Sequence, residues 1–294
     1  MAEWFTFSLA FFTSLVLFQF SVYNKKGLSA GIRLISHFIA AVWAVFCLDG
    51  FSRLNLGFAE LNLFWLINVL AVIAIVWMIN LYNFMDGIDG IAGTEAITIS
   101  GAAAIFLWVQ NSGLVAVCLL ILAAVLGFLI WNWPPAKIFM GDVGSGFLGF
   151  VIAVLAIWSE NSGAAPLLIW LLLLGVFIVD ATVTLVKRMT RGEKLYEAHR
   201  SHVYQLAVQA GYSHKQVTLT ILLINMMLGI VAAGTFYCYY DYIWIIVLAA
   251  LTMLIICHLV LAKVFHARIN VSVNNNVLIN QADAEAAVAS DTVE

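Results

Sequence analysis

The chain has 294 residues, of which 64% are hydrophobic and 10% are charged, with a formal net charge of −3. A soluble domain has about 25% charged residues to cover its surface, and a nucleic-acid-binding protein has a basic excess. The composition therefore excludes a soluble enzyme, a disordered chain, a coiled coil and a nucleic-acid binder. The mean hydropathy of +1.03 favours a polytopic membrane protein.

Apolar runs of about 20 residues are the length that a membrane-spanning helix needs. Because these runs are apolar all round and do not alternate, they indicate helices and not barrel strands. We predict an all-α bundle with about nine spans, the first of them retained because the N-terminal segment has no basic leader or cleavage site. The predicted spans are 4–22, 31–48, 61–80, 92–110, 114–131, 145–159, 165–186, 217–238 and 242–263.

The basic residues lie almost entirely in the loops on one side of the predicted membrane. Because cytoplasmic loops are rich in Lys and Arg, this side is predicted to be cytoplasmic. Arg53 alone falls on the opposite side from the other 12 of the 13 bases. We predict a transmembrane domain over 1–264, with its N-terminus outside, and a polar, disordered cytoplasmic tail over 265–294. The 12 bases are Lys25, Lys26, Arg33, Lys137, Lys187, Arg188, Arg191, Lys194, Arg200, Lys215, Lys263 and Arg268.

Two predicted cytoplasmic loops carry carboxylates and glycines. The first runs from Asn80 to Gly90 and reads Asn-Leu-Tyr-Asn-Phe-Met-Asp-Gly-Ile-Asp-Gly, with Asn83, Asp86 and Asp89 as its other polar residues. Two carboxylates three positions apart can converge on one hard cation or on a ligand's donor groups. The alternative is a polar turn whose Asp and Asn side chains cap a helix.

The second loop runs from Asn132 to Gly146, with two prolines, Lys137, Phe139 and a glycine-rich segment around Asp142. Prolines end a helix and stiffen the loop, and glycines let a ligand approach the backbone. Asp142 precedes a predicted helix, whose N-terminal N–H groups can bind an anion. The loop could hold a metal-bridged diphosphate, or it could be a structural re-entrant turn.

A third cytoplasmic loop, from Lys187 to Lys215, contains His199, Arg200 and His202. Its Lys and Arg side chains can neutralise phosphates or contact anionic lipid headgroups. Imidazoles can donate to a phosphate or carry protons, although solvated loop histidines remain an alternative. Asp180 lies within an apolar span, where it either forms a structural pair or supports a site.

These motifs resemble the polyprenyl-phosphate N-acetylhexosamine-1-phosphate transferases, a part of glycosyltransferase family 4 that includes the phospho-MurNAc-pentapeptide transferase. The resemblance covers roughly 20–216 and rests on the Asn80–Gly90 and Asn132–Gly146 segments and on the Ala-His-Arg-Ser-His loop, which is closest to the O-antigen-initiating branch. It implies a bundle of ten or eleven helices. The implied reaction transfers a sugar 1-phosphate from a UDP-sugar to undecaprenyl phosphate at the cytoplasmic face of a bacterial inner membrane and releases UMP.

The resemblance also implies the roles of individual residues. It makes Asp142 a ligand of Mg²⁺, with Mn²⁺ as an alternative ion, and places the ring of Phe139 on uracil. It implies catalytic roles for Asp86, Asp89, His199 and His202, with the two histidines facing the phosphates. The residues with implied substrate-binding roles are Asn80, Asn83, Asn132, Lys137, Phe139 and Arg200. A homodimer is a further expectation.

One departure from the family pattern concerns an Asp-Asp pair. Alignment on the segment after Lys25 and Lys26 puts Tyr23 and Asn24 at the position of the pair, and neither can act as a carboxylate base. Against the family the chain is also about two spans short, so the sequence predicts an N-terminally truncated member. The alternatives are an inactive remnant or a partner-binding membrane protein, whereas a transporter would need more polar groups within the membrane.

Overall fold

The computed structural model describes residues 29–61, 64–110, 112–194 and 199–291. Over these ranges the chain is a bundle of helices with one two-residue antiparallel hairpin, formed by β1 (Leu54–Asn55) and β2 (Glu60–Leu61). The predicted all-α class is confirmed. The predicted span 4–22 and the pair Tyr23 and Asn24 lie outside the described residues.

The predicted spans between 31 and 159, and the span at 217–238, correspond to helices that begin and end within a few residues of the expected limits. Seven helices in the described part are long and apolar enough to cross a membrane, or eight if one bent pair is a single span. The elements are α2 (Ala30–Cys47), α3 (Phe64–Met85), α4 (Ile91–Val109), α5 (Val115–Asn132), α6 (Gly141–Asn161), α7 (Leu167–Leu173), α8 (Gly175–Thr190), α9 (Val203–Gln209), α10 (His214–Cys238), η1 (Tyr240–Tyr242) and α11 (Ile243–Asp291).

The bent pair is α7 and α8, where the sequence predicted one span over 165–186. The two helices differ in direction by 79° and meet at Leu174. Gly175 follows the break, and a Cβ atom there would lie 2.9 Å from Cδ1 of Leu254 on α11. The glycine therefore lets the bend pack closely on α11, a contact that the apolar pattern does not record.

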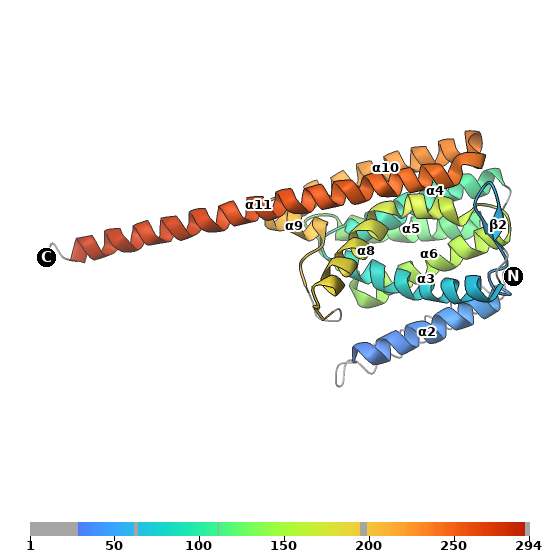
Figure 1. The fold of residues 1–294 in the computed structure, drawn as a ribbon, viewed down its shortest axis with the longest axis horizontal. Coiled ribbons are helices and arrows are strands. Elements are labelled where there is room, and N and C mark those ends of the chain that lie inside the picture. Colours follow the sequence, from blue (N-terminus) through green and yellow to red (C-terminus); the bar gives the residue numbers. More distant parts are fainter. Residues whose placement is uncertain (1–28, 62–63, 111, 195–198, 292–294) are drawn as a thin grey trace.

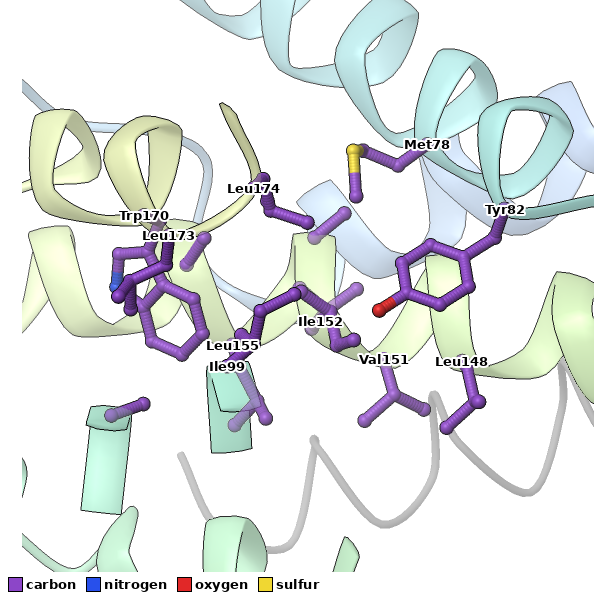
Figure 2. Packing of buried hydrophobic residues seen from close by; sticks show 14 of the residues in the cluster. Met78, Tyr82, Ile99, Leu148, Val151, Ile152, Leu155, Trp170, Leu173 and Leu174 are labelled. Carbon is purple, nitrogen blue, oxygen red and sulfur yellow. The ribbon is translucent and has the colours of Figure 1, made fainter. Parts of the chain in front are cut away.

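The core lies where α3, α4, α6 and α7 meet. Figure 2 shows the side chains of Tyr82, Ile99, Ile152 and Trp170 converging from these four helices, and each is almost fully buried. α6 packs directly against α3 at Gly149, where a Cβ would clash with the backbone of Met78. Small residues permit such close helix packing, which holds the ends of α3 and α6 side by side.

The polar loops gather at one end of the bundle and the hairpin lies at the other (Figure 1). α6 connects the two ends: with 21 residues it is about 30 Å long. Asp142 is in its first turn, whereas Asn161 at its last residue donates to the carbonyl of Gly50 beside the hairpin. The loops that precede α4 and α6 therefore meet at the Asp142 end.

The C-terminal helix differs from the expected tail. α11 continues beyond the predicted boundary at 264 and ends at Asp291, and it projects from the bundle (Figure 1). The expectation of disorder from 265 relied on polarity and on missing apolar periodicity. However, 265–291 contains no proline or glycine to end a helix that begins in an apolar span.

Candidate active site

Asp86 lies in the turn between α3 and α4. Its carboxylate accepts a hydrogen bond from the backbone N–H of Gly141, at the start of α6. Burial, and then the neighbouring carboxylate of Asp142, raise the pKa of Asp86 to about 7. The two acids, 56 positions apart in sequence, are therefore electrostatic neighbours at the junction of α3 and α6.

Asn132 joins the two glycine-rich loops. Its Oδ1 accepts from the N–H of Gly90 at 3.0 Å, and its Nδ2 donates to the carbonyl of Ile138 at 2.8 Å. The side chain is buried, with 4% exposed. Asp89 adds a second link, because its Oδ2 accepts from the N–H of Ala136 at 3.1 Å. Asn132, predicted to bind substrate, thus has both polar atoms engaged in shaping the site.

A cavity of about 330 Å³ lies between these loops. It brings together six of the predicted residues, which come from α3, the end of α5, the start of α6 and the turns beside them. The exposed ring of Phe139 and three carboxylates are at its edge or in its wall. Its lining residues are Asn83, Asp86, Gly87, Ile88, Asp89, Asn132, Phe139, Met140, Gly141, Asp142 and His214.

Asp142 occupies the first turn of α6, where the helix dipole favours a negative charge. Its Oδ2 lies 3.3 Å from Nη1 of Arg33 on α2, and both side chains are exposed to solvent. One turn later, Oγ of Ser145 accepts from Nδ2 of Asn83 at 3.2 Å. The N-terminal part of α6 is thereby joined to α3 by a side-chain contact and to α2 by an ion pair.

The oxygen-rich wall suits a hard divalent cation. Asp86 and Asp142 repel each other, and a cation between such carboxylates relieves that repulsion. No group of three or more His, Cys, Asp or Glu side chains in the described part of the chain is arranged to hold a metal ion. Mg²⁺ usually takes one or two carboxylates and completes its shell with water and substrate phosphates, so this pair fits it.

Two residues with implied substrate-binding roles lie away from the cavity. Asn80 is almost two turns before Asp86, and its Nδ2 donates to the carbonyl of Val76 at 2.7 Å and lies 3.4 Å from Nδ1 of His37. The amine of Lys137 lies over the ring of Trp131, 5.3 Å from its centroid. Neither residue lines the cavity, so the structure places both beside the site and not in it.

His202, predicted to be catalytic, is 3% exposed. It is the N-cap of α9, and its Nδ1 lies 3.4 Å from Oδ1 of Asp180. The same carboxylate accepts from the backbone N–H groups of Val203 and Tyr204 at 3.0 and 3.3 Å. Asp180 therefore supports the loop by holding the N-terminus of α9.

The other two residues of this loop also lie outside the cavity lining. His199 is partly buried, and its ring centroid lies 5.0 Å from that of His202. Burial, and then the charges of His202 and Arg188, lower the pKa of His199 to about 4. Arg200 is exposed, and its carbonyl accepts from Nε2 of Gln209 at 2.8 Å.

α9 nevertheless packs against the turn that forms one wall of the cavity. The hydroxyl of Tyr204 donates to the carbonyl of Phe84 at 2.9 Å, and a Cβ at Gly87 would meet the ring of Tyr204. The ring of His202 also stacks against Phe84, with centroids 6.4 Å apart. The histidine loop thus packs against the turn that carries Asp86, and Gly87 is needed for this close approach.

Sequence reasoning missed two residues near the site. His214 begins α10 and lines the cavity, 125 positions from its contact Asp89. The Ser213-x-x-Gln216 capping box marks a helix start and could have placed this histidine at a helix N-terminus. Glu95, one turn into α4, is fully buried, and its Oε2 accepts from Nδ2 of Asn225 on α10 at 2.5 Å.

Comparison with known proteins agrees with these motifs. A sequence model described as glycosyl transferase family 4 matches residues 6–160, just over half of the chain. The chain is 33% identical over 143 residues to a protein of Bacillus subtilis named probable undecaprenyl-phosphate N-acetylglucosaminyl 1-phosphate transferase, a match that covers 48% of this chain and 40% of that protein.

Two further relatives carry the name phospho-N-acetylmuramoyl-pentapeptide-transferase. The one from Halalkalibacterium halodurans is 34% identical over 146 residues, covering 48% of this chain and 42% of the relative. The one from Geobacillus thermodenitrificans is 35% identical over 147 residues, covering 47% and 43%. The chain thus matches about two fifths of the length of each of these relatives. Since the family match extends over more than half of the sequence, the chain belongs to glycosyl transferase family 4.

Proposed function

We propose that the protein transfers a sugar 1-phosphate from a UDP-sugar to undecaprenyl phosphate at the cytoplasmic face of a bacterial inner membrane. The observation that carries this proposal is the cavity between the two glycine-rich loops, where Asp86, Asp89 and Asp142 converge beside the exposed ring of Phe139. The names of the relatives, which specify undecaprenyl-phosphate and N-acetylhexosamine substrates, support this substrate class.

In the proposed reaction, an oxygen of the lipid phosphate attacks the β-phosphorus of the UDP-sugar. The bond from that phosphorus to the bridging oxygen breaks, UMP leaves, and the product is a polyprenyl diphosphate sugar. Asp86, in the cavity wall, would take the last proton of the lipid phosphate monoester. Asp142 would hold Mg²⁺ or Mn²⁺, and a bound ion would neutralise charge on the diphosphate and on UMP.

The exposed Phe139 offers an aromatic face for the uracil ring, and Asn83 lies in the same wall. The cavity lies at the end of the bundle where the predicted cytoplasmic loops gather, so a soluble nucleotide sugar and a lipid phosphate can both reach it. We further propose an N-acetylhexosamine as the sugar and the initiation of a cell-envelope glycan of the O-antigen type as the role.

The test incubates membranes containing the chain with radiolabelled UDP-N-acetylhexosamines and undecaprenyl phosphate. We expect a lipid-extractable labelled product that needs a divalent cation, with stoichiometric release of UMP. A set of UDP-sugars identifies the sugar. No product with any of them, from protein shown to be folded, would contradict the proposal.

A second candidate is a family member without transfer activity that binds a partner in the membrane. Tyr23 and Asn24, at the place of the expected Asp-Asp pair, favour it. The double variant Tyr23→Asp, Asn24→Asp distinguishes the two candidates in the same assay. Activity gained only by the variant supports the second candidate, whereas robust turnover by the unaltered chain excludes it.

A further inference from the structure

The cavity has an uneven charge distribution. Among the described residues that line it, three carry carboxylates, Asp86, Asp89 and Asp142, and His214 is the one that can carry a positive charge. Arg33 and Lys137 lie nearby but outside the lining. A ligand with phosphate groups is repelled by the carboxylates, so its phosphates need a cationic or hydrogen-bond-donating group in the wall.

His214 is firmly placed at the start of α10. Ser213 caps the helix: its Oγ accepts from the N–H of Gln216, and the Gln216 side chain accepts from the N–H of Ser213. One turn further, the hydroxyl of Thr218 donates to the carbonyl of Asp89 at 2.9 Å. The N-terminus of α10 is thereby attached to the Asp89 turn without help from the imidazole.

The imidazole makes its own contact with Asp89. Its Nδ1 lies 3.3 Å from Oδ2 of Asp89 and also accepts from the backbone N–H of Asp89 at 3.5 Å, and the side chain is 40% exposed. Because Nδ1 faces the carboxylate, Nε2 is the ring nitrogen left for a ligand in the cavity. With Nδ1 accepting from the Asp89 N–H, Nε2 carries the proton and can donate to a phosphate; in an imidazolium Nδ1 donates to the Asp89 carboxylate instead, and Nε2 again donates. Carboxylates that hold one nitrogen of a histidine commonly orient the other toward its ligand.

We propose that His214 binds a phosphate group of the substrate through Nε2, with Asp89 orienting the ring through Nδ1. This inference rests on the proposed function, and the phosphate belongs either to the nucleotide diphosphate or to the lipid phosphate. Because Thr218 already links α10 to the Asp89 turn, the partly exposed ring of His214 is available for the ligand.

Two substitutions separate the two nitrogens. In His214→Asn the side-chain amide lies near the position of Nδ1 and nothing replaces Nε2, whereas in His214→Gln the amide reaches the position of Nε2. Lys215→Gln is the matched control, because Lys215 is the adjacent, exposed base outside the cavity. Binding of UDP with Mg²⁺, of undecaprenyl phosphate and of uridine is measured by calorimetry on the full chain in lipid nanodiscs.

We expect His214→Asn to weaken binding of one phosphate-bearing probe by about 10-fold or more, as for a lost charge-assisted hydrogen bond. His214→Gln should bind within about threefold of the parent, given a neutral donor at the same place. Lys215→Gln should bind as the parent does, and uridine binding should be equal in all variants. Weaker UDP binding assigns the contact to the nucleotide, and weaker undecaprenyl phosphate binding assigns it to the lipid. If His214→Asn does not fold, His214→Ala takes its place.

Three outcomes overturn the inference: parent-like binding of both probes by His214→Asn, greater loss in His214→Gln than in His214→Asn, or no binding of either probe by the parent. The second outcome would mean that the ring acts only through Asp89. A parent that binds the probes but forms no product contradicts the proposed function and leaves the His214 comparison intact. If the parent forms product and every His214 variant binds the probes as the parent does, the His214 inference is contradicted and the proposed function is not.

Discussion

The guanidinium of Arg33 lies 3.3 Å from the carboxylate of Asp142, although α2 and α6 are 109 positions apart at these residues. The pair crosses the edge of the cavity at the acid proposed to hold a divalent cation. A guanidinium and a metal ion cannot both neutralise the same carboxylate oxygen, so we expect the ion pair and metal binding to compete.

Removing Arg33 should therefore strengthen metal binding. Exposed ion pairs contribute about 0.2–1 kcal/mol, so Arg33→Gln should lower the dissociation constant for Mn²⁺ by up to about fivefold. Arg53→Gln is the control, since Arg53 forms a similarly exposed pair with Glu60 in the hairpin region, at 3.2 Å. Electron paramagnetic resonance of free Mn²⁺ measures both constants. Unchanged or weaker binding in Arg33→Gln would show that the pair does not compete with the metal.

Asp142 itself should be essential for the metal. Asp142→Asn removes a charged oxygen ligand, and we expect about a 10-fold or greater loss of Mn²⁺ affinity together with loss of turnover. Asp241→Asn, an exposed acid at the hairpin end of the bundle, should change neither. Mn²⁺ titration and the labelled-lipid assay are the measurements. Normal metal affinity in Asp142→Asn would remove this residue from the proposed metal site.

Asp180 should matter for stability, because its buried carboxylate accepts two backbone N–H groups of α9 and the hydroxyl of Thr184. Asp180→Ala leaves these donors unpaired, and we expect the free energy of unfolding to fall by about 3 kcal/mol. The free energy of unfolding is measured by denaturant titration in detergent, followed by tryptophan fluorescence, with Asp241→Ala as the control. A loss no larger than the control's would mean that Asp180 does not hold α9.

His199 predicts a pH dependence of stability. Its pKa in the folded protein is lowered to about 4, against 6.5 for the free side chain. Between these values the unfolded chain binds more protons, so this residue makes stability fall as the pH decreases from 6.5 toward 4. The effect is small because the ring is partly exposed. His199→Gln should reduce the dependence of the melting temperature on pH over this range. His266→Gln, which replaces an exposed histidine on α11, should leave that dependence unchanged. An equal slope in the parent and in His199→Gln would contradict the assignment.

The contact between Glu95 and Asn225 should hold α4 against α10. Asn225 also lies 3.3 Å from the hydroxyl of Thr98, and both Glu95 and Asn225 are buried within the bundle. Asn225→Leu leaves the buried carboxyl group without this partner, and we expect about 2 kcal/mol of destabilisation. Met226→Leu, at the adjacent lipid-exposed position, is the matched control. Equal unfolding free energies of the two variants would count against a role for the contact.

Much of the site was predictable because its residues are close together in sequence. Asp86 and Asp89 share one turn, and Asn132, Phe139 and Asp142 share another, so each motif indicated a polar loop between apolar spans. The enrichment of Lys and Arg in alternate loops then predicted that both loops lie on the same side of the membrane. The helical bundle followed from the length and uniform hydrophobicity of the spans, which leave their backbone groups no partners except their own.

The tertiary structure decided which of these residues share a cavity. His202 and Asn132 look alike in sequence as polar residues of cytoplasmic loops, yet burial turns one toward Asp180 and gives the other two loop-shaping hydrogen bonds. His214 enters the cavity only because α10 packs on α4. The sequence by itself determined the class, the approximate positions of most spans and the two acidic motifs, since these depend on local composition. The bend at Leu174, the pairing of Arg33 with Asp142 and the place of His214 depend on how distant helices pack, which no local pattern records.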